Sequence, residues 1–181
     1  ALPGGGFTAA FFQDGDLLIQ SYTAPGIAMA GSFVAIPGGG ATVGGGNDLR
    51  PSIHTLNDGK VLVMWSGNGN YSDGDCSGVM ATLYATDGSI TTTQVNLSEF
   101  NDQSYVSFAQ ISATEIVAVW YDLSASADGS LSAIKGRMLS YNGAAITPSG
   151  GEFIVNSSTY GDQWVPVVTA TGSGGFLVSW T

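Results

Sequence analysis

The stretch Val61-Leu62-Val63-Met64-Trp65 decides the fold, because its pattern recurs along the chain. Each copy is a five-residue, mostly apolar run that ends in an aromatic residue. The copies are 7–11, 61–65, 116–120 and 176–180, and their last residues lie 54, 55 and 60 positions apart. This spacing indicates a structural repeat of about 55 residues. Near-continuous apolar character is typical of a strand that is buried on both faces. We therefore expect each run to be a strand that is covered on both sides by stacked sheets.

A second segment keeps the same order and follows each apolar run. The decamers 17–26, 79–88 and 134–143 align without a gap and end in Pro-Gly, Asp-Gly and Asn-Gly. These dipeptides are typical of tight turns. Residues 79–84 alternate between apolar and polar side chains, so we expect this strand to have one wetter face.

Two further strands complete each repeat. The first strands are expected at 51–56, 105–111 and 165–170, and the fourth strands at 32–36, near 94–95 and at 152–155. Sustained helical periodicity is absent, because Gly and Asn interrupt every candidate window. The sequence therefore predicts an all-β protein in which antiparallel, four-stranded units succeed one another.

Four-stranded units of this length are typical of β-propeller blades. We interpret 1–181 as one repeat domain with approximate periods 1–46, 47–100, 101–160 and a partial period 161–181. The chain should then hold two complete blades, flanked by most of one blade and the first half of another. About three periods are too few to close a ring, which predicts either an incomplete ring within a larger repeat protein or several copies that complete a ring or build an open array.

Composition excludes some classes of partner. The chain has 14 acidic and four basic residues, a formal net charge of -10, and only 10% charged residues. Nucleic acid and anionic lipid both need clustered Lys and Arg, so neither is an expected partner, and no membrane-inserting run is present. The acidic balance is compatible with cations and with neutral ligands such as sugars. Cys76 is the single cysteine; we interpret it as an incidental small residue, with an intermolecular bridge or a reactive thiol as the alternative.

Three phrases near the end of the chain carry a family resemblance. They are 150–156 (Gly-Gly-Glu-Phe-Ile-Val-Asn), 161–163 (Gly-Asp-Gln) and 174–180 (Gly-Gly-Phe-Leu-Val-Ser-Trp). Asn101-Asp102-Gln103 and Asn47-Asp48 repeat the middle phrase with decreasing fidelity, and Phe11 replaces the final Trp in the first copy. The chain resembles extracellular bacterial repeats of very large secreted proteins, often found beside calcium-binding RTX segments. The resemblance covers essentially the whole chain and implies β-propeller-type display or adhesion modules with differing ligands.

The tryptophans divide into two groups. Trp65, Trp120 and Trp180 end buried strands, so we expect them to pack between blades with their indole N–H groups on backbone acceptors. Trp164 lies in a polar loop near Tyr160, which makes these two aromatics, with Tyr71, the candidate ligand-binding residues; packing over the blade edge is the alternative for Trp164.

Acidic residues suggest a calcium site in one long loop. Asp73-Gly74-Asp75 follows Asn68, Asn70 and Ser72, which gives alternate oxygen-bearing side chains and a glycine bend. Ca²⁺ prefers six to eight oxygen ligands, and Asn70, Asp73 and Asp75 are the candidate ligands. The alternative is a solvated acidic loop without a cation. A different set, Asp48, Asp102 and Asp162, recurs before the first strands and is interpreted as a turn motif.

The residues needed for catalysis are not found together. His54 is the single histidine and is expected to be a structural hydrogen-bonding residue, so neither a His-rich metal site nor a Ser-His-Asp triad is predicted. The glutamates Glu99, Glu115 and Glu152 fall at inequivalent positions, and Arg50 and Arg137 are the only arginines. We therefore expect no enzyme activity from this chain alone.

Three functions remain as hypotheses. The first is a secreted or cell-surface module that binds a ligand, with glycans as one compatible class, and mediates adhesion. The second is a structural subunit of an extracellular filament or surface layer that assembles through exposed blade edges. The third is part of a propeller-type polysaccharide hydrolase or lyase whose catalytic residues lie partly outside this chain.

Overall fold

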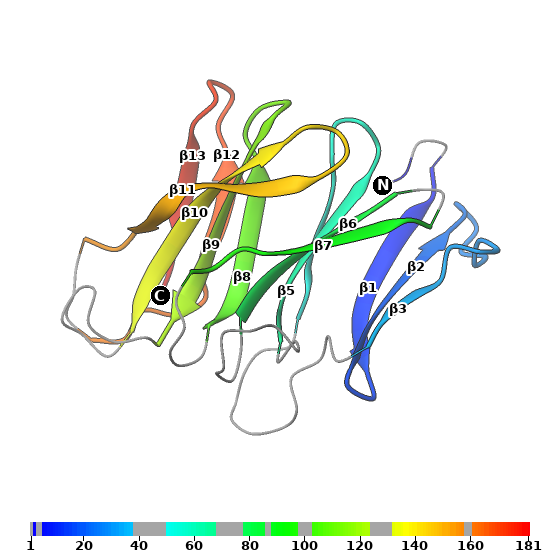
Figure 1. The fold of residues 1–181 in the computed structure, drawn as a ribbon, viewed down its shortest axis with the longest axis horizontal. Helices are drawn as coiled ribbons and strands as arrows, with labels where there is room; N and C mark the ends of the chain where they lie inside the picture. Colours follow the sequence, from blue (N-terminus) through cyan, green and yellow to red (C-terminus); the bar gives the residue numbers. More distant parts are fainter. Residues whose placement is uncertain are drawn as a thin grey trace.

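Thirteen strands in four antiparallel sheets make up the described part of the chain, in which no helix occurs (Figure 1). The computed structural model describes residues 2, 5–37, 50–67, 78–85, 88–97, 103–123, 132–157 and 161–181. The strands are β1 Phe7–Gln13, β2 Asp16–Tyr22, β3 Val34–Ile36, β4 Ser52–Thr55, β5 Val61–Gly67, β6 Gly78–Tyr84, β7 Ile90–Gln94, β8 Gln103–Gln110, β9 Glu115–Asp122, β10 Ala133–Tyr141, β11 Ile146–Ile154, β12 Val167–Ala170 and β13 Phe176–Ser179. No helix of these residues is long and apolar enough to cross a membrane.

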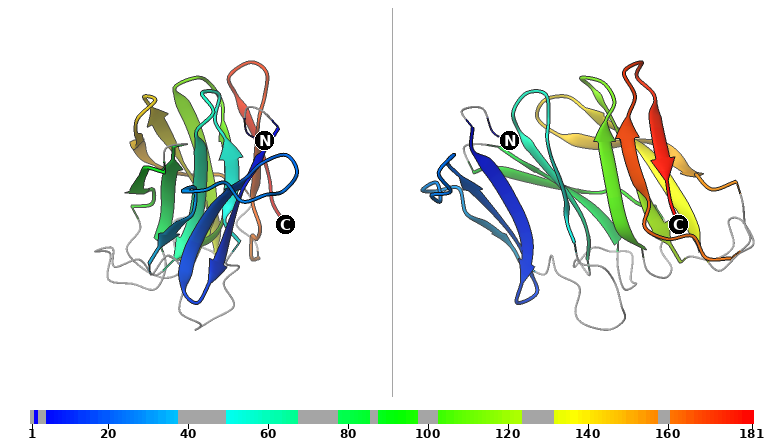
Figure 2. Two further views of the ribbon diagram at one scale, coloured as in Figure 1. Left: turned by 90° about the vertical axis from the view of Figure 1, so that its right-hand side faces the viewer. Right: turned by 180° about the vertical axis from the view of Figure 1, so that it is seen from behind.

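Each sheet is a meander of consecutive strands. Sheet A is β1–β3, sheet B is β4–β7, sheet C is β8–β11 and sheet D is β12–β13. The predicted all-β class and the antiparallel pairing are therefore confirmed, and the four sheets have three, four, four and two strands. The sheets lie in a row from A to D, and the described residues do not close into a ring (Figures 1 and 2).

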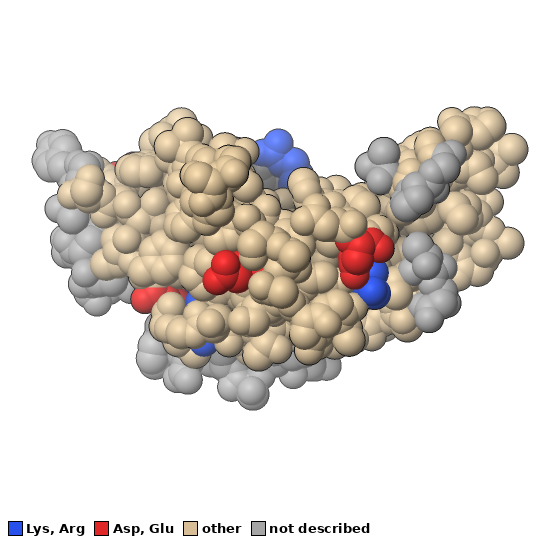
Figure 3. Space-filling model, turned by 90° about the horizontal axis from the view of Figure 1, so that it is seen from above, with Lys and Arg blue, Asp and Glu red and all other residues tan. Residues whose placement is uncertain are grey.

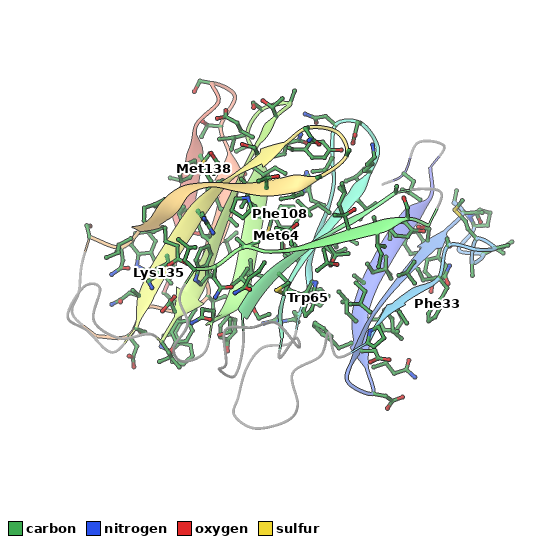
Figure 4. The ribbon with its side chains drawn as sticks, in the orientation of Figure 1. Phe33, Met64, Trp65, Phe108, Lys135 and Met138 are labelled. Atoms are coloured by element: carbon green, nitrogen blue, oxygen red, sulfur yellow. The ribbon has the colours of Figure 1, made fainter. Side chains whose placement is uncertain are left out.

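The sheets pack face to face through the second strands of sheets B and C, whose side chains point alternately to the preceding and the following sheet. On β5, Val61, Val63 and Trp65 belong to the core shared with sheet A, whereas Leu62 and Met64 belong to the core shared with sheet C. Strand β9 repeats this arrangement between sheets B and D. All seven residues of β5 are buried, which confirms the prediction of a strand covered on both faces. Figure 4 shows Trp65 between sheets A and B, and Met64 with Phe108 between sheets B and C.

The prediction of a wetter face on the third strand is wrong for β6. All of its residues are buried, because Met80 and Tyr84 face sheet A while Val79, Ala81 and Leu83 face sheet C. The polar residue of the alternation, Thr82, is fully buried as well. Its hydroxyl is accommodated by hydrogen bonds with the indole of Trp65 and with Thr92.

Candidate functional site

Most of the predicted site residues lie outside the described part of the chain. These are the expected calcium ligands Asn70, Asp73 and Asp75 and the candidate ligand-binding residues Tyr71 and Tyr160. Cys76, Asp48 and Asp102 lie outside it too. Within the described residues, no three His, Cys, Asp or Glu side chains are grouped so that they could hold a metal ion.

Trp164 is described, and it packs between two sheets. Its ring stacks on Tyr121 of β9 at 4.6 Å and 18°, and meets Tyr105 of β8 edge-on at 6.1 Å. Its backbone exchanges two hydrogen bonds with Thr181, which extends the β12–β13 ladder. The indole is still 39% exposed. Trp164 is thus first a contact between sheets C and D, with one part of its ring left at the surface.

A concave site of about 250 Å³ lies at the start of β4, β8 and β12. These are the first strands of sheets B, C and D, and we call them the inner strands. The walls of the site are three sequence-equivalent segments, one from each of sheets B, C and D: 50–52, 105–107 and 165–167. Tyr105 and Val165 both have a positive φ, 55° and 50°, and the β8–β9 register shifts between Ser104 and Ser107. The bulge in β8 inserts one residue relative to β9, and Tyr105 and Val165 line the site beside Arg50.

The buried tryptophans hold polar side chains rather than the backbone. Trp65 donates its indole N–H to the hydroxyl of Thr82 at 3.2 Å, and Trp120 donates to Oδ2 of Asp122 at 3.3 Å. Inter-sheet packing by these two residues is confirmed, but the predicted backbone acceptors are wrong. A side-chain acceptor is available because each partner lies on the same or the adjacent buried strand.

Two of the charged residues considered for catalysis, Glu152 and Arg137, have structural partners. Lys135 forms ion pairs with Asp122 at 3.1 Å and with Glu152 at 3.6 Å, and Glu152 also accepts a hydrogen bond from the amide of Leu97. Arg137 donates to the carbonyls of Val95 and Gly150. This network ties the ends of β7, β10 and β11 together, and it explains why these ions are buried.

The expected hydrogen-bonding role of His54 is not seen among the described residues, where its ring contacts another aromatic ring. It is exposed on β4, and its ring lies edge-on to Phe108 at 6.1 Å. Its described contact is therefore aromatic packing between the inner strands of sheets B and C.

Two Asn–Gln pairs, at equivalent positions of successive repeats, form hydrogen bonds between neighbouring sheets. Asn96 and Asn156 each follow the fourth strand of their sheet. The side-chain oxygen of Asn96 accepts a hydrogen bond from the backbone N–H of Val79 on β6, and that of Asn156 accepts one from Ile134 on β10, both at 2.9 Å. Their amide groups reach Gln103 and Gln163 at the start of the next sheet. Asp162 accepts a hydrogen bond from Ser132 rather than from a turn amide. The recurrent Asn and Gln are thus inter-sheet connectors.

Asp58 and Tyr141 connect sheets B and C at a hairpin turn. The phenol of Tyr141 donates a hydrogen bond to Asp58, which also pairs with Lys60. Burial would raise the pKa of Asp58, but the hydrogen bonds from Tyr141 and Lys60 hold that pKa below its usual value. Burial and the neighbouring carboxylate raise the pKa of the Tyr141 phenol well above its usual value. This pair is a structural contact that remains in its phenol–carboxylate form at neutral pH.

Sheet A leaves one apolar face open. The Trp position of the repeat is 1% exposed at Trp65 and 0% at Trp120, because the preceding sheet covers each of them. The equivalent residue of sheet A, Phe11, is 37% exposed, and Phe7 on the same face is 46% exposed. Phe33 lies on the side of sheet A that faces away from sheet B (Figure 4) and is 56% exposed.

Sheet D leaves the opposite kind of face open. Leu62 and Val117 point toward the sheet that follows their own and are fully buried. Leu177 occupies the same position of β13 and is 63% exposed, and Val167 beside it is 54% exposed. The two ends of the row therefore expose the two halves of the contact that joins every pair of neighbouring sheets.

The exposed faces of sheets A and D were not predicted, although the alignment of the apolar runs contains the signal for them. Phe11 and Leu177 align with apolar residues of the other repeats that are buried in the structure. The inner-strand bulges left no such signal, because nothing in the side chains of Tyr105 or Val165 favours a positive φ.

Comparisons with known proteins leave the geometry as the sole guide to function. A scan against family models, a search of curated proteins and a search of solved structures each returned no match.

Proposed function

We propose that this chain is a structural module that assembles head to tail, so that sheet D of one copy packs on sheet A of the next. The observation that carries the proposal is the exposure of Phe11 and Leu177, whose equivalents inside the row are buried by neighbouring sheets. The contact needs no new chemistry, since the interfaces A–B and B–C already use it. A propeller-like ring and an open array are the two products of such stacking, and an extracellular filament or surface layer is the setting we favour.

The stability of the proposed contact comes from apolar burial. Fully burying one Leu or Phe side chain stabilises by about 1.5–3 kcal/mol. The two end faces expose four apolar residues, each between 37% and 63% exposed: Phe7, Phe11, Val167 and Leu177. Charge does not favour close approach, because the formal net charge is -10; the association should therefore strengthen as added salt screens this repulsion.

Sedimentation velocity over a range of concentrations tests the proposal. We expect a concentration-dependent series of species that shifts toward larger particles at high salt. Phe11→Ser should reduce association, whereas Ile90→Ser, which removes a residue of similar exposure from outer strand β7 (40% against 37%), should not. A strictly monomeric wild type at all concentrations would contradict the proposal.

A second candidate function is ligand binding and adhesion. It is favoured by the concave site at the starts of β4, β8 and β12, where an arginine, a tyrosine and serines come together beside the part-exposed Trp164. Aromatic rings beside polar groups suit neutral sugars, so a glycan is the ligand class that we would test first. Calcium in the 70–75 loop is a further part of this proposal.

Glycan-array binding in calcium and in a chelator tests this second function. We expect a sugar-dependent signal that Tyr105→Ala weakens, and a calcium dependence if the 70–75 loop contributes. Absence of binding under both conditions would count against it. An enzymatic role has no support from the described residues, where the acidic and basic side chains discussed above form structural contacts.

A further inference from the structure

Strand β1 has an open hydrogen-bonding edge. Within the described residues it pairs with β2 alone. In sheets B, C and D the equivalent strands β5, β9 and β13 each carry an inner strand on that edge, namely β4, β8 and β12. Sheet A is therefore the one sheet of the described chain without an inner strand, and its edge lies beside β4.

The backbone groups that point to this edge follow from the hairpin geometry. Asp14 and Gly15 form a two-residue turn with φ of 52° and 88°, which closes on the pair Gln13–Asp16. A two-residue turn of this kind closes on a hydrogen-bonded pair, and such pairs alternate along an antiparallel ladder. Odd-numbered residues of β1 thus bond to β2, while Thr8 and Ala10 direct their N–H and C=O groups to the open edge.

The same analysis of β5 shows how an inner strand uses these groups. The hairpin bond from Leu56 N–H to the carbonyl of Lys60, at 2.7 Å, sets the alternation, so that His54 bonds with Leu62 and Ser52 with Met64. Leu62 and Met64 are the repeat equivalents of Thr8 and Ala10. The edge of β1 therefore offers the pattern that β5 offers to β4.

The chain itself contains the comparison that shows what is missing. Ile53, Phe108 and Val168 occupy one position of the inner strands, each opposite the third residue of its apolar run. Phe108 and Val168 are both 6% exposed, because the inner strand of the preceding sheet covers them through His54 and Ser107. Ile53 follows sheet A and is 37% exposed.

A groove occupies the place of the missing strand. It has a volume of about 460 Å³ and is lined by Phe7, Thr8, Ile53, His54, Thr55 and Val61. None of these side chains carries a formal charge at pH 7 with His neutral. Seen from above, the surface is hollowed between the end that holds sheet A and the middle of the molecule (Figure 3).

The geometry points to a strand-accepting site: the edge of β1 binds an extended, uncharged segment of a partner polypeptide as a fourth strand of sheet A. The three inner strands describe the segment, because they place Ser-Ile-His-Thr, Ser-Phe-Ala-Gln and Val-Val-Thr-Ala on this edge. The second residue is apolar in each, and the residues on either side of it face the position equivalent to Ile53, as His54 does at Phe108 and Ser107 does at Val168. Main-chain hydrogen bonds supply the affinity and the groove selects the side chains. This site uses an edge of sheet A rather than a face, and it shares only Phe7 with the proposed stacking face.

A peptide of residues 50–56 (Arg-Pro-Ser-Ile-His-Thr-Leu) is the probe that tests the site. It is titrated into ¹⁵N-labelled wild-type protein at a concentration where the protein sediments as a monomer. We expect saturable one-to-one binding with amide shifts at Thr8 and Ala10. N-methylation at the His54 position removes a donor that faces β1 and should weaken binding about tenfold or more. N-methylation at the Ile53 position, whose N–H faces away, is the matched control and should leave binding unchanged.

Variants of the protein provide an independent arm. Thr8→Pro removes an edge N–H but keeps the bonds to β2, because proline is tolerated where the N–H faces solvent. Thr8→Val loses the same side-chain bond to Ser21 and keeps the N–H. We expect Thr8→Val to bind the peptide and Thr8→Pro to lose binding about tenfold or more. No saturable binding by the wild type, or equal binding of the two N-methylated peptides, would overturn the inference, and neither result depends on whether copies stack through Phe11 and Leu177.

Discussion

Two Lys–Asp ion pairs of nearly equal length differ in their surroundings. Lys135 and Asp122 lie 3.1 Å apart with side chains 10% and 1% exposed, while Lys60 and Asp58 lie 3.0 Å apart with side chains 31% and 36% exposed. Lys135→Met keeps the aliphatic packing but leaves Asp122 and Glu152 buried without their cation. We expect it to lower the free energy of unfolding by about 3–5 kcal/mol, as measured by urea denaturation.

The exposed pair supplies the control for that substitution. Lys60→Met should change the free energy of unfolding by less than about 1 kcal/mol, because water and side-chain entropy offset an exposed ion pair. Equal losses in the two variants would show that burial of the Lys135 network does not determine its contribution.

Tyr141 and Asp58 should make stability depend on pH at both extremes. The pKa of Asp58 is held below its unfolded value of 3.8, so its contribution is present above that pH and is lost as the pH falls through the native pKa. The pKa of Tyr141 is raised above its unfolded value of 10.0, so its contribution is full below pH 10 and is lost as the pH rises beyond it. The urea midpoint of Tyr141→Phe should therefore change less with pH than that of the wild type, both below pH 4 and above pH 10. Parallel plots of midpoint against pH would contradict the assignment.

At the scale of the element, the Asn connectors should protect single strands. Asn96 caps the amide of Val79 on β6, and Asn156 caps the amide of Ile134 on β10. Replacing either Asn by Ala leaves a buried donor unpaired, which costs about 1–3 kcal/mol. Asn96→Ala should speed hydrogen exchange at Val79 but not at Ile134, and Asn156→Ala should do the reverse, so each variant controls for the other. Equal effects at both amides in each variant would mean that the connectors act only through global stability.

The second strands and the turns were predictable because each carries a local signal, whereas the fourth strands expected near 94–95 and at 152–155 are longer and begin earlier, as β7 Ile90–Gln94 and β11 Ile146–Ile154. Apolar runs gave β5 and β9, and Pro-Gly, Asp-Gly and Asn-Gly gave the turns, where Gly26, Gly88 and Gly143 have positive φ. The burial of Thr82 was missed because a buried hydroxyl needs a partner from another strand, and Trp65 could not be assigned to it from sequence. The expected Asp turn motif failed at Asp162 for the same reason, since its partner Ser132 is 30 residues away in the chain.

The candidate sites were less predictable than the strands. Trp164 was singled out from the sequence as an aromatic residue in a polar loop, but its stacking on Tyr121 depends on how sheets C and D meet. The groove beside β1 was not predicted at all, because within the described residues it lies at an edge of sheet A where no strand pairs with β1. An absent neighbour leaves no residue to interpret, and only the comparison among Ile53, Phe108 and Val168 makes it visible.

At the scale of the whole molecule, the row of sheets has a direction. On β5 and β9 the last aromatic residue of the apolar run faces the preceding sheet, and the second residue of the run faces the following sheet, as Trp65 and Leu62 do on β5. The open ends are consequently unlike each other, with Phe11 at one and Leu177 at the other. Contacts between unlike faces are heterologous and generate rings or open arrays rather than closed two-fold dimers.

Mixing two defective variants distinguishes this arrangement from a symmetric dimer. Phe11→Ser damages the face of sheet A and leaves sheet D intact, whereas Leu177→Ser damages sheet D and leaves sheet A intact. Neither variant alone should associate. An equimolar mixture should form a heterodimer and nothing larger, because only one of the four possible contacts joins two undamaged faces. Sedimentation velocity of the mixture, with each variant carrying a different absorbing label, measures this directly. Association of Leu177→Ser with itself would instead show that the Phe11 face pairs with its own copy, and the head-to-tail arrangement would have to be abandoned.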